Sequence, residues 1–180
     1  MKKLILLFVL CPILLATQCD PDDSPCGRLI ELQKNDLITI ENRQTEYNLN
    51  DILWLNTTVD RNQQTSNSTF DLFQFNDKLA YYVELKKESI YNPNNFLILN
   101  EQTTVIRQGE SDGNTFILVK DGNTFKNNIG IKLLEPGNYT LMIYNIGSHI
   151  PNRTDCNFTS FSIATDFNGM DSNSFSFVVN

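Results

Sequence analysis

The sequence predicts an all-β protein, and three observations support this. Apolar and polar residues alternate with a period of two along several segments, as they do on a half-buried strand. Clusters of Gly, Pro, Asn and Asp separate these segments, as turns separate strands. Helical periodicity does not recur along the chain. Many short strands joined by such turns are typical of a sandwich or a barrel.

Eight segments fit the strand pattern. In chain order they cover Leu37–Glu41, Ile52–Val59, Leu79–Lys86, Phe96–Leu99, Phe116–Lys120, Ile129–Leu134, Tyr139–Ile143 and Phe175–Val179. Turn signals fall between them at Asn50-Asp51, Asn92-Pro93-Asn94, Asp112-Gly113, Asp121-Gly122 and Pro136-Gly137. The polar stretch Thr58–Thr69 is predicted to be a mobile loop or an edge excursion. Trp54 lies in the most apolar strand and is predicted to be a buried core anchor, with a sugar-stacking surface ring as the alternative.

The first eighteen residues have the pattern of a cleaved signal peptide. Lys2 and Lys3 precede an apolar run from Leu4 to Leu15, and small residues follow. The run is shorter than the roughly 20 apolar residues that a membrane-spanning helix needs. We therefore expect a signal peptide over residues 1–18, an acidic tether over 19–25 and a single β-domain over 26–180.

Cys19 is the predicted site of lipid attachment. The segment Leu15-Ala16-Thr17-Gln18-Cys19 resembles a bacterial lipoprotein signal, in which the cysteine becomes the new N-terminus and carries acyl chains such as palmitate. Removal of the leader leaves three cysteines, an odd number for an oxidising compartment. Acylation of Cys19 leaves one pair, Cys26–Cys156, and we expect a disulfide with a stabilising role of about 4–5 kcal/mol.

Charge and composition exclude several classes of function. The chain has a net charge of −7, and the loss of Lys2 and Lys3 with the leader makes it more acidic. A nucleic-acid binder needs a basic face, so this class is disfavoured. One histidine and four cysteines exclude most multi-histidine metal sites and a four-cysteine zinc site on the mature chain. We expect no cofactor.

No catalytic motif stands out in the sequence. His149 follows Ser148 directly, and adjacent residues rarely aim their side chains at one another, so we expect a loop histidine without catalytic work. The Gly-x-Ser-x-Gly and His-Glu-x-x-His patterns are absent. Paired carboxylates could support glycoside hydrolysis only at the right separation in space. We therefore predict that the chain is not an enzyme.

Two segments are weak candidates for calcium. Their oxygen-bearing side chains are Asp166, Asn168 and Asp171 in one segment, and Glu110, Asp112 and Asn114 in the other. Neither segment fits the twelve-residue EF-hand loop, and ordinary Asx turns explain both better than a metal site does. We expect no metal site.

Beyond the leader, the chain resembles a family of uncharacterised bacteroidete-type lipoproteins. Tyr47–Leu55 is similar to their Tyr-x-x-Gly-Asp-x-Leu-Trp-Leu opening, and Pro136–Leu141 and Phe175–Val179 are similar to their late strands. The acidic run Asp20–Asp23 resembles their surface-export signal, with an ordinary solvated linker as the alternative. The resemblance implies an immunoglobulin-like antiparallel β-sandwich of about 7–9 strands at the bacterial outer membrane, exposed at the cell surface.

Three hypotheses for function follow. The first is a membrane-anchored, non-catalytic cell-surface lipoprotein that binds a surface protein or glycan or has a structural role. The second is a carbohydrate-binding or carbohydrate-processing protein, which would need exposed aromatic rings among Tyr47, Tyr81, Tyr82 and Tyr91. The third is a eukaryotic secreted glycoprotein, in which Cys19 would be an unpaired thiol. Its glycosylation sequons would be Asn56, Asn67, Asn138, Asn152 and Asn157.

Overall fold

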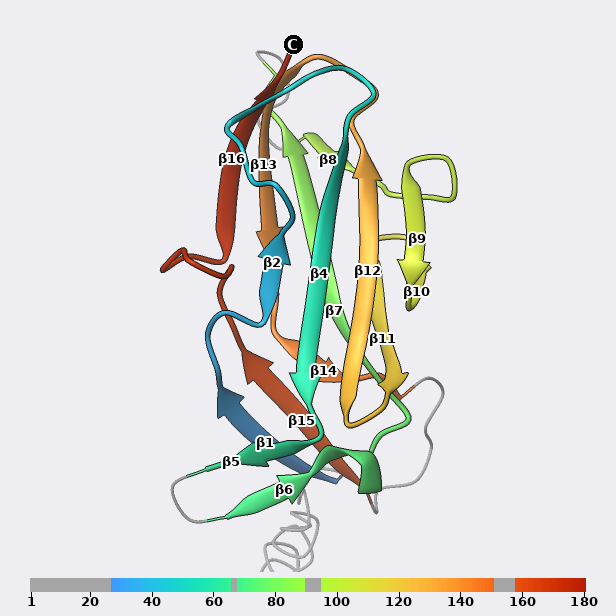
Figure 1. Ribbon diagram of the computed structural model, residues 1–180, viewed down its shortest axis with the longest axis vertical. Helices are drawn as coiled ribbons and strands as arrows, with labels where there is room; N and C mark the ends of the chain where they lie inside the picture. Colours follow the sequence, from blue (N-terminus) through green and yellow to red (C-terminus); the bar gives the residue numbers. More distant parts are fainter. Residues whose placement is uncertain (1–26, 66–67, 90–94, 151–157) are drawn as a thin grey trace, which may run out of the picture.

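The chain folds into two facing β-layers. The structure, a computed structural model, describes residues 27–65, 68–89, 95–150 and 158–180. The front layer of Figure 1 contains, in spatial order, β2 (Ile38–Ile40), β4 (Ile52–Asp60), β12 (Thr124–Lys132) and β9 (Thr104–Gln108). The rear layer contains β3 (Glu46–Tyr47), β16 (Ser174–Val179), β13 (Gly137–Ile143), β7 (Lys78–Lys87) and β8 (Asn95–Leu97).

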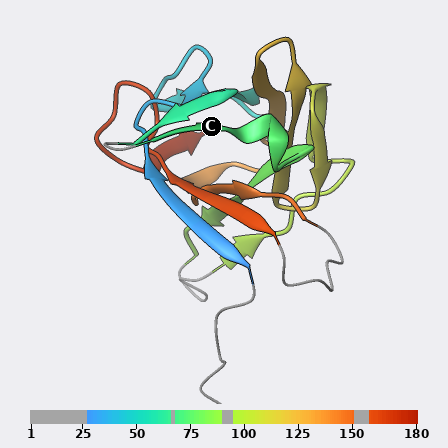
Figure 2. The same cartoon turned by 90° about the horizontal axis from the view of Figure 1, so that it is seen from below.

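The remaining strands complete the lower end and one side. They are β1 (Arg28–Gln33), β15 (Thr159–Ala164), β14 (Ile146–Ser148), β11 (Thr115–Asp121), β10 (Glu110–Asp112), and a separate hairpin of β5 (Asn62–Gln64) and β6 (Thr69–Asp71). A 3₁₀ turn, η1 (Leu72–Gln74), follows this hairpin. Figure 2 shows β1 and β15 side by side at this lower end. Within the described ranges the chain forms no helix whose length and apolar character would let it span a bilayer.

β11 joins the two layers. It pairs with β7 through Thr115–Val119 and with β12 through Val119–Asp121. The layers therefore curl into one sheet of 14 strands, with β7 at the centre of the rear layer and the long β4–β12 ladder at the centre of the front layer. All-β architecture is confirmed.

The predicted strands all overlap observed ones, but two details of the prediction were wrong. Sixteen strands are present among the described residues, more than the expected seven to nine. Some additional strands, such as β10 and β14, are only three residues long and too short to show an alternation. Others, such as β1 and β15, have six residues each and pair with one another. The sandwich is also not wholly antiparallel, because β1 runs parallel to β15 and β3 parallel to β16.

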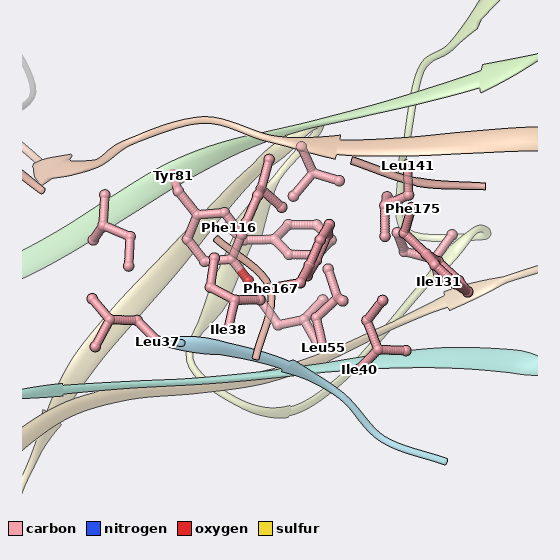
Figure 3. Close-up of a cluster of buried hydrophobic side chains, with 14 of the residues drawn as sticks. Leu37, Ile38, Ile40, Leu55, Tyr81, Phe116, Ile131, Leu141, Phe167 and Phe175 are labelled. Carbon is pink, nitrogen blue, oxygen red and sulfur yellow. The ribbon is translucent and has the colours of Figure 1, made fainter. Parts of the chain in front are cut away.

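The core lies between the two layers and follows the period-two pattern. Figure 3 shows its centre, where side chains from both layers and from β11 meet. Its fully buried members include Ile38, Leu55, Leu79, Phe116, Phe125, Leu141, Ile143 and Phe167. Burial of such side chains is the main stabilising term of the fold, at about 1.5–3 kcal/mol each.

Trp54 is not the core anchor that the sequence predicts. Leu53 and Leu55 point inward and are buried, so alternation places Trp54 on the outer face of the front layer, where it is half-buried. The guanidinium of Arg107 lies 3.5 Å from the centre of its ring. Because residues 52–55 are all apolar, the sequence does not indicate which side chains of this strand point into the core. The Arg107 contact also occupies the surface on which a sugar would stack.

A polar contact crosses the apolar core. The Thr57 hydroxyl donates to the Tyr81 hydroxyl at 2.9 Å, and both residues are buried. Burial raises the pKa of Tyr81 to about 12, and interactions with Thr57 and Asn127 oppose the rise only in part. Neither side-chain amide atom of Asn127 reaches full hydrogen-bond geometry with a described residue, so we regard Thr57 as the firm partner.

Tyr81→Phe is expected to destabilise the protein by about 1–3 kcal/mol near neutral pH, because the buried Thr57 hydroxyl loses its acceptor. This difference should shrink at high pH. The unfolded chain loses the phenolic proton above pH 10.0, whereas the folded protein retains it to about pH 12. The contribution of the Tyr81 hydroxyl to the free energy of unfolding is therefore fully present below pH 10.0. It falls by about 1.4 kcal/mol per pH unit between pH 10.0 and about pH 12.

Urea unfolding of both proteins at about pH 8 and about pH 11 measures this effect. Tyr82→Phe is the matched control, because it removes the same hydroxyl from an exposed ring and should change the free energy of unfolding by less than about 0.5 kcal/mol. A difference between wild type and Tyr81→Phe that is the same at both pH values would contradict the prediction.

Candidate functional site

One outer surface of the rear layer gathers exposed aromatic and charged side chains. Alternation along β7 turns Tyr82, Glu84 and Lys86 outward. The residues that alternate with them, Tyr81, Val83 and Leu85, are buried in the core. Phe96 of β8 pairs with Lys86, and Tyr144 follows the end of β13. We call Tyr82, Glu84, Lys86, Phe96 and Tyr144 the aromatic face.

The aromatic face is held together by short contacts. The rings of Tyr82 and Tyr144 meet edge to face with centres 5.8 Å apart, and they are 48% and 46% exposed. The Tyr144 hydroxyl donates to Glu84 at 2.9 Å, and the Lys86 ammonium pairs with Glu84 at 2.8 Å. Lys86 also lies 4.9 Å from the centre of the exposed Phe96 ring. The face is thus ordered before any ligand arrives.

Hydrogen bonds set the protonation states of Glu84 and Tyr144 on this face. The hydrogen bond from Lys86 holds the pKa of the Glu84 carboxyl below its usual range, against the opposing effect of burial. The hydrogen bond to Glu84 raises the pKa of Tyr144. Glu84 is therefore an anion and Tyr144 a hydrogen-bond donor at physiological pH, each with a fixed partner.

The arrangement suits recognition rather than chemistry. Half-exposed tyrosine rings offer large contact area with little loss of side-chain entropy, and the adjacent charges can orient a polar ligand. The two tyrosine planes are inclined at 65°, so they form a cradle and not one flat platform. Each ring can stack on a separate unit of a ligand.

Sequence reasoning identified only part of this face. Of the four candidate tyrosines, Tyr82 is exposed, Tyr47 and Tyr81 are buried in the core, and Tyr91 lies outside the described residues. Tyr47 and Tyr81 cannot supply the exposed rings that the carbohydrate hypothesis needs, because both side chains point between the layers. Tyr144 was missed, although the alternation of Leu141 and Ile143 already turns it outward.

A second concave feature lies beside β9. This cleft, which we call the β9 cleft, has a volume of about 670 Å³. It is lined by Leu99, Asn100, Glu101, Thr104, Val105, Ile106, Ser111, Asp112, Gly113 and Lys132. Lys132 forms no ion pair in the described part of the chain, whereas the other six described lysines each have one. The volume of the β9 cleft falls within the range that is typical of sites for small ligands.

A smaller apolar hollow of about 130 Å³ adjoins this cleft and shares Leu99 and Lys132 with it. Its rim includes Ile98, which is 81% exposed, and the exposed Leu134. Asn114 holds this region in place, because its amide donates to the carbonyls of Val83 and Leu97 and accepts from the Leu99 amide. Asn114 is thus a structural link between strands.

The calcium candidates do not converge on an ion site. No group of three histidine, cysteine or acidic side chains within the described ranges could hold a metal. The side-chain amide of Asn168 donates to the Thr39 hydroxyl, and the main-chain carbonyl of Asn168 accepts from Arg43. Glu110 pairs with Lys78. The Glu110 carboxylate is therefore neutralised by a lysine.

The remaining sequence candidates lie apart from both features. The Ser148 hydroxyl accepts from the Phe161 amide at 2.8 Å and is therefore directed to β15. Asn56 and Asn138 are exposed, as glycosylation sites would need to be. Cys19, Cys26 and Cys156 lie outside the described residues, as do Asn67, Asn152 and Asn157.

Comparisons with known proteins return distant β-domains. No protein-family model and no curated protein matches the chain. Among solved structures it is similar to the human F-spondin reeler domain (10% identity, TM-score 0.37), covering 87% of this chain and 96% of that chain. WR4, a C. elegans MSP family member, has 12% identity and a TM-score of 0.28, with 72% and 100% covered.

The tip adhesin CupB6 from Pseudomonas aeruginosa is also similar, at 14% identity and a TM-score of 0.27, with 78% of this chain and 42% of that chain covered. Likeness at these levels assigns neither a family nor a function. The residues of the aromatic face and of the β9 cleft therefore support the proposals that follow.

Proposed function

We propose that this chain is a non-catalytic binding module, held at the outer surface of a bacterial cell by acyl chains on Cys19. The observation that supports binding is the aromatic face, on which Tyr82 and Tyr144 stay half-exposed while Glu84 and Lys86 fix their surroundings. Surface tyrosines with ordered partners are typical of binding hot spots. The two facing layers support our further proposal of an immunoglobulin-like sandwich.

The position of the proposed anchor agrees with this role. The described chain begins at β1, at the lower end of Figure 1, whereas β8 lies towards the upper end. An anchor that precedes β1 would direct the β8 end, with Phe96, away from the membrane. A ligand in the external medium would then have access to the aromatic face.

Carbohydrate binding is a second and more specific candidate function, and the aromatic face favours it. Tyrosine rings stack on the apolar faces of sugars, and a carboxylate with a lysine beside it can bond to hydroxyl groups. The 65° inclination of the rings suits a twisted or branched chain of sugars better than a flat one.

One experiment with two readouts tests the proposal. The full chain and a Cys19→Ser variant are expressed in a bacterial host with radiolabelled palmitate, extracted in detergent and applied to a glycan array. We expect label on the native chain and none on the variant. Glycan binding should fall by about 10- to 30-fold in the Tyr82→Ala/Tyr144→Ala double variant.

Phe75→Ala is the matched control for the array, because Phe75 is an exposed aromatic residue at the other end of the molecule. Equal labelling of the native and Cys19→Ser chains would overturn the anchor. Glycan binding that survives in the double variant would overturn the assignment of the ligand to the aromatic face.

A further inference from the structure

Ile106 faces inward, but the described residues leave about half of it exposed. Ile106 pairs with Ile129, and paired residues of neighbouring strands point to the same side of a sheet. Ile129 is fully buried, yet Ile106 is 48% exposed. β9 lies at the outer side of the front layer, beyond β12, and Ile106 lines the β9 cleft there. The sandwich is therefore incomplete at this position.

The main chain of β9 is also open at this edge beyond Thr104, whose amide donates to the Asn100 carbonyl at 2.9 Å. Among the described strands, β9 pairs only with β12. The Lys132 amide donates to the Thr103 carbonyl at 2.8 Å, and antiparallel pairing alternates from that point. The amide and carbonyl of Ile106 consequently point away from β12, where no described backbone group meets them. An open edge of this kind can accept a further strand.

The charges of the β9 cleft indicate the kind of strand. Glu101, Asp112 and Lys132 line the cleft, and none of them forms an ion pair within the described residues. Two carboxylates and one ammonium leave the cleft with a net negative charge. A basic side chain on the incoming strand would meet this charge, whereas an acidic one would be repelled.

We propose that an extended, basic segment of a partner protein adds to β9 as a further strand. Its main chain pairs with Ile106, an apolar side chain covers Ile106, and a lysine or arginine approaches Glu101 and Asp112. This binding mode uses a different surface from the aromatic face and does not depend on the function proposed above.

The probe is the fluorescein-labelled peptide acetyl-KVKVKVK-amide, titrated with the full chain and followed by fluorescence anisotropy. We expect saturable binding that weakens as salt is added. The acidic peptide acetyl-DVDVDVD-amide, and a version of the basic peptide with proline at its centre, should each bind at least about tenfold more weakly. Equal binding of all three peptides would overturn strand addition.

Variants place the peptide at β9. Ile106→Arg should weaken binding at least about tenfold, and Ile98→Arg is the matched control because Ile98 is exposed outside the β9 cleft. Ile106→Thr is a milder variant that should also weaken peptide binding, but by less. It keeps the test valid if Ile106→Arg fails to fold. Tyr82→Ala should leave peptide binding unchanged, which separates this proposal from the aromatic face.

Hydrogen exchange gives a direct readout of the pairing. The Ile106 amide should exchange more slowly when the peptide is bound, since it then donates to the added strand. Unchanged exchange at Ile106 in the saturated complex, or full binding by Ile106→Arg, would overturn the proposal.

Discussion

Replacing Phe116 by alanine is expected to lower the free energy of unfolding by about 3–5 kcal/mol. Phe116 is fully buried in β11, the strand that joins the two layers, and its ring meets Tyr81 edge to face with centres 5.9 Å apart. It lies at the centre of the core (Figure 3). Neighbours on both layers cannot collapse into the space without breaking their strand pairing, so a cavity remains.

Urea unfolding followed by fluorescence gives this loss directly. Phe96→Ala is the matched control, because the same atoms are removed from an exposed ring on β8, and a change within about 0.5 kcal/mol is expected there. A loss below about 1 kcal/mol for Phe116→Ala would show that this side chain is not enclosed by two layers.

Gly109→Ala is expected to cost about 2–5 kcal/mol, from a strained backbone and a steric clash together. Gly109 joins β9 to β10 with a φ of 88°, in a region that favours glycine. A methyl group there would lie 2.5 Å from the Ile117 carbonyl oxygen and 2.7 Å from Cβ of Asn127. Both atoms belong to the sheet itself and cannot move aside without breaking pairing.

Gly122→Ala separates the two contributions. Gly122 has a similar positive φ of 57°, but an added methyl group would meet nothing within 4 Å. Only the backbone cost of about 1–2 kcal/mol remains there. Thermal or urea unfolding of both variants measures the difference. Equal losses would mean that the chain does not pack against Gly109 as described.

The sequence by itself determined the fold class and the positions of the main strands. Alternation along Leu79–Lys86 and Tyr139–Ile143 is a local property, since successive side chains of a strand point to opposite faces. It correctly turned Tyr82 away from Tyr81. It could not say which of the two faces would be covered, so Tyr81 and Tyr82 both stayed candidates for the exposed rings that a sugar-binding surface needs.

Uniformly apolar segments carried less information than alternating ones. In 52–55 and 96–99, every residue is apolar, so apolar side chains point to both faces of the strand. Which of them are buried depends on what packs over each face. The tertiary structure turned Trp54 outward beneath Arg107 and left Phe96 exposed beside Lys86. The short strands β10 and β14 form because a longer neighbouring strand supplies their hydrogen bonds. No local sequence pattern predicts them.

Only the tertiary structure could assemble the two candidate binding surfaces. The aromatic face draws on β7, on the next strand β8, and on the end of β13, which is far from both in the chain, and the three meet through strand pairing. That Lys132 forms no ion pair with any described residue is likewise visible only in the folded chain. Facing along a strand is set by local geometry, whereas exposure, charge pairing and open edges are set by contacts between distant segments.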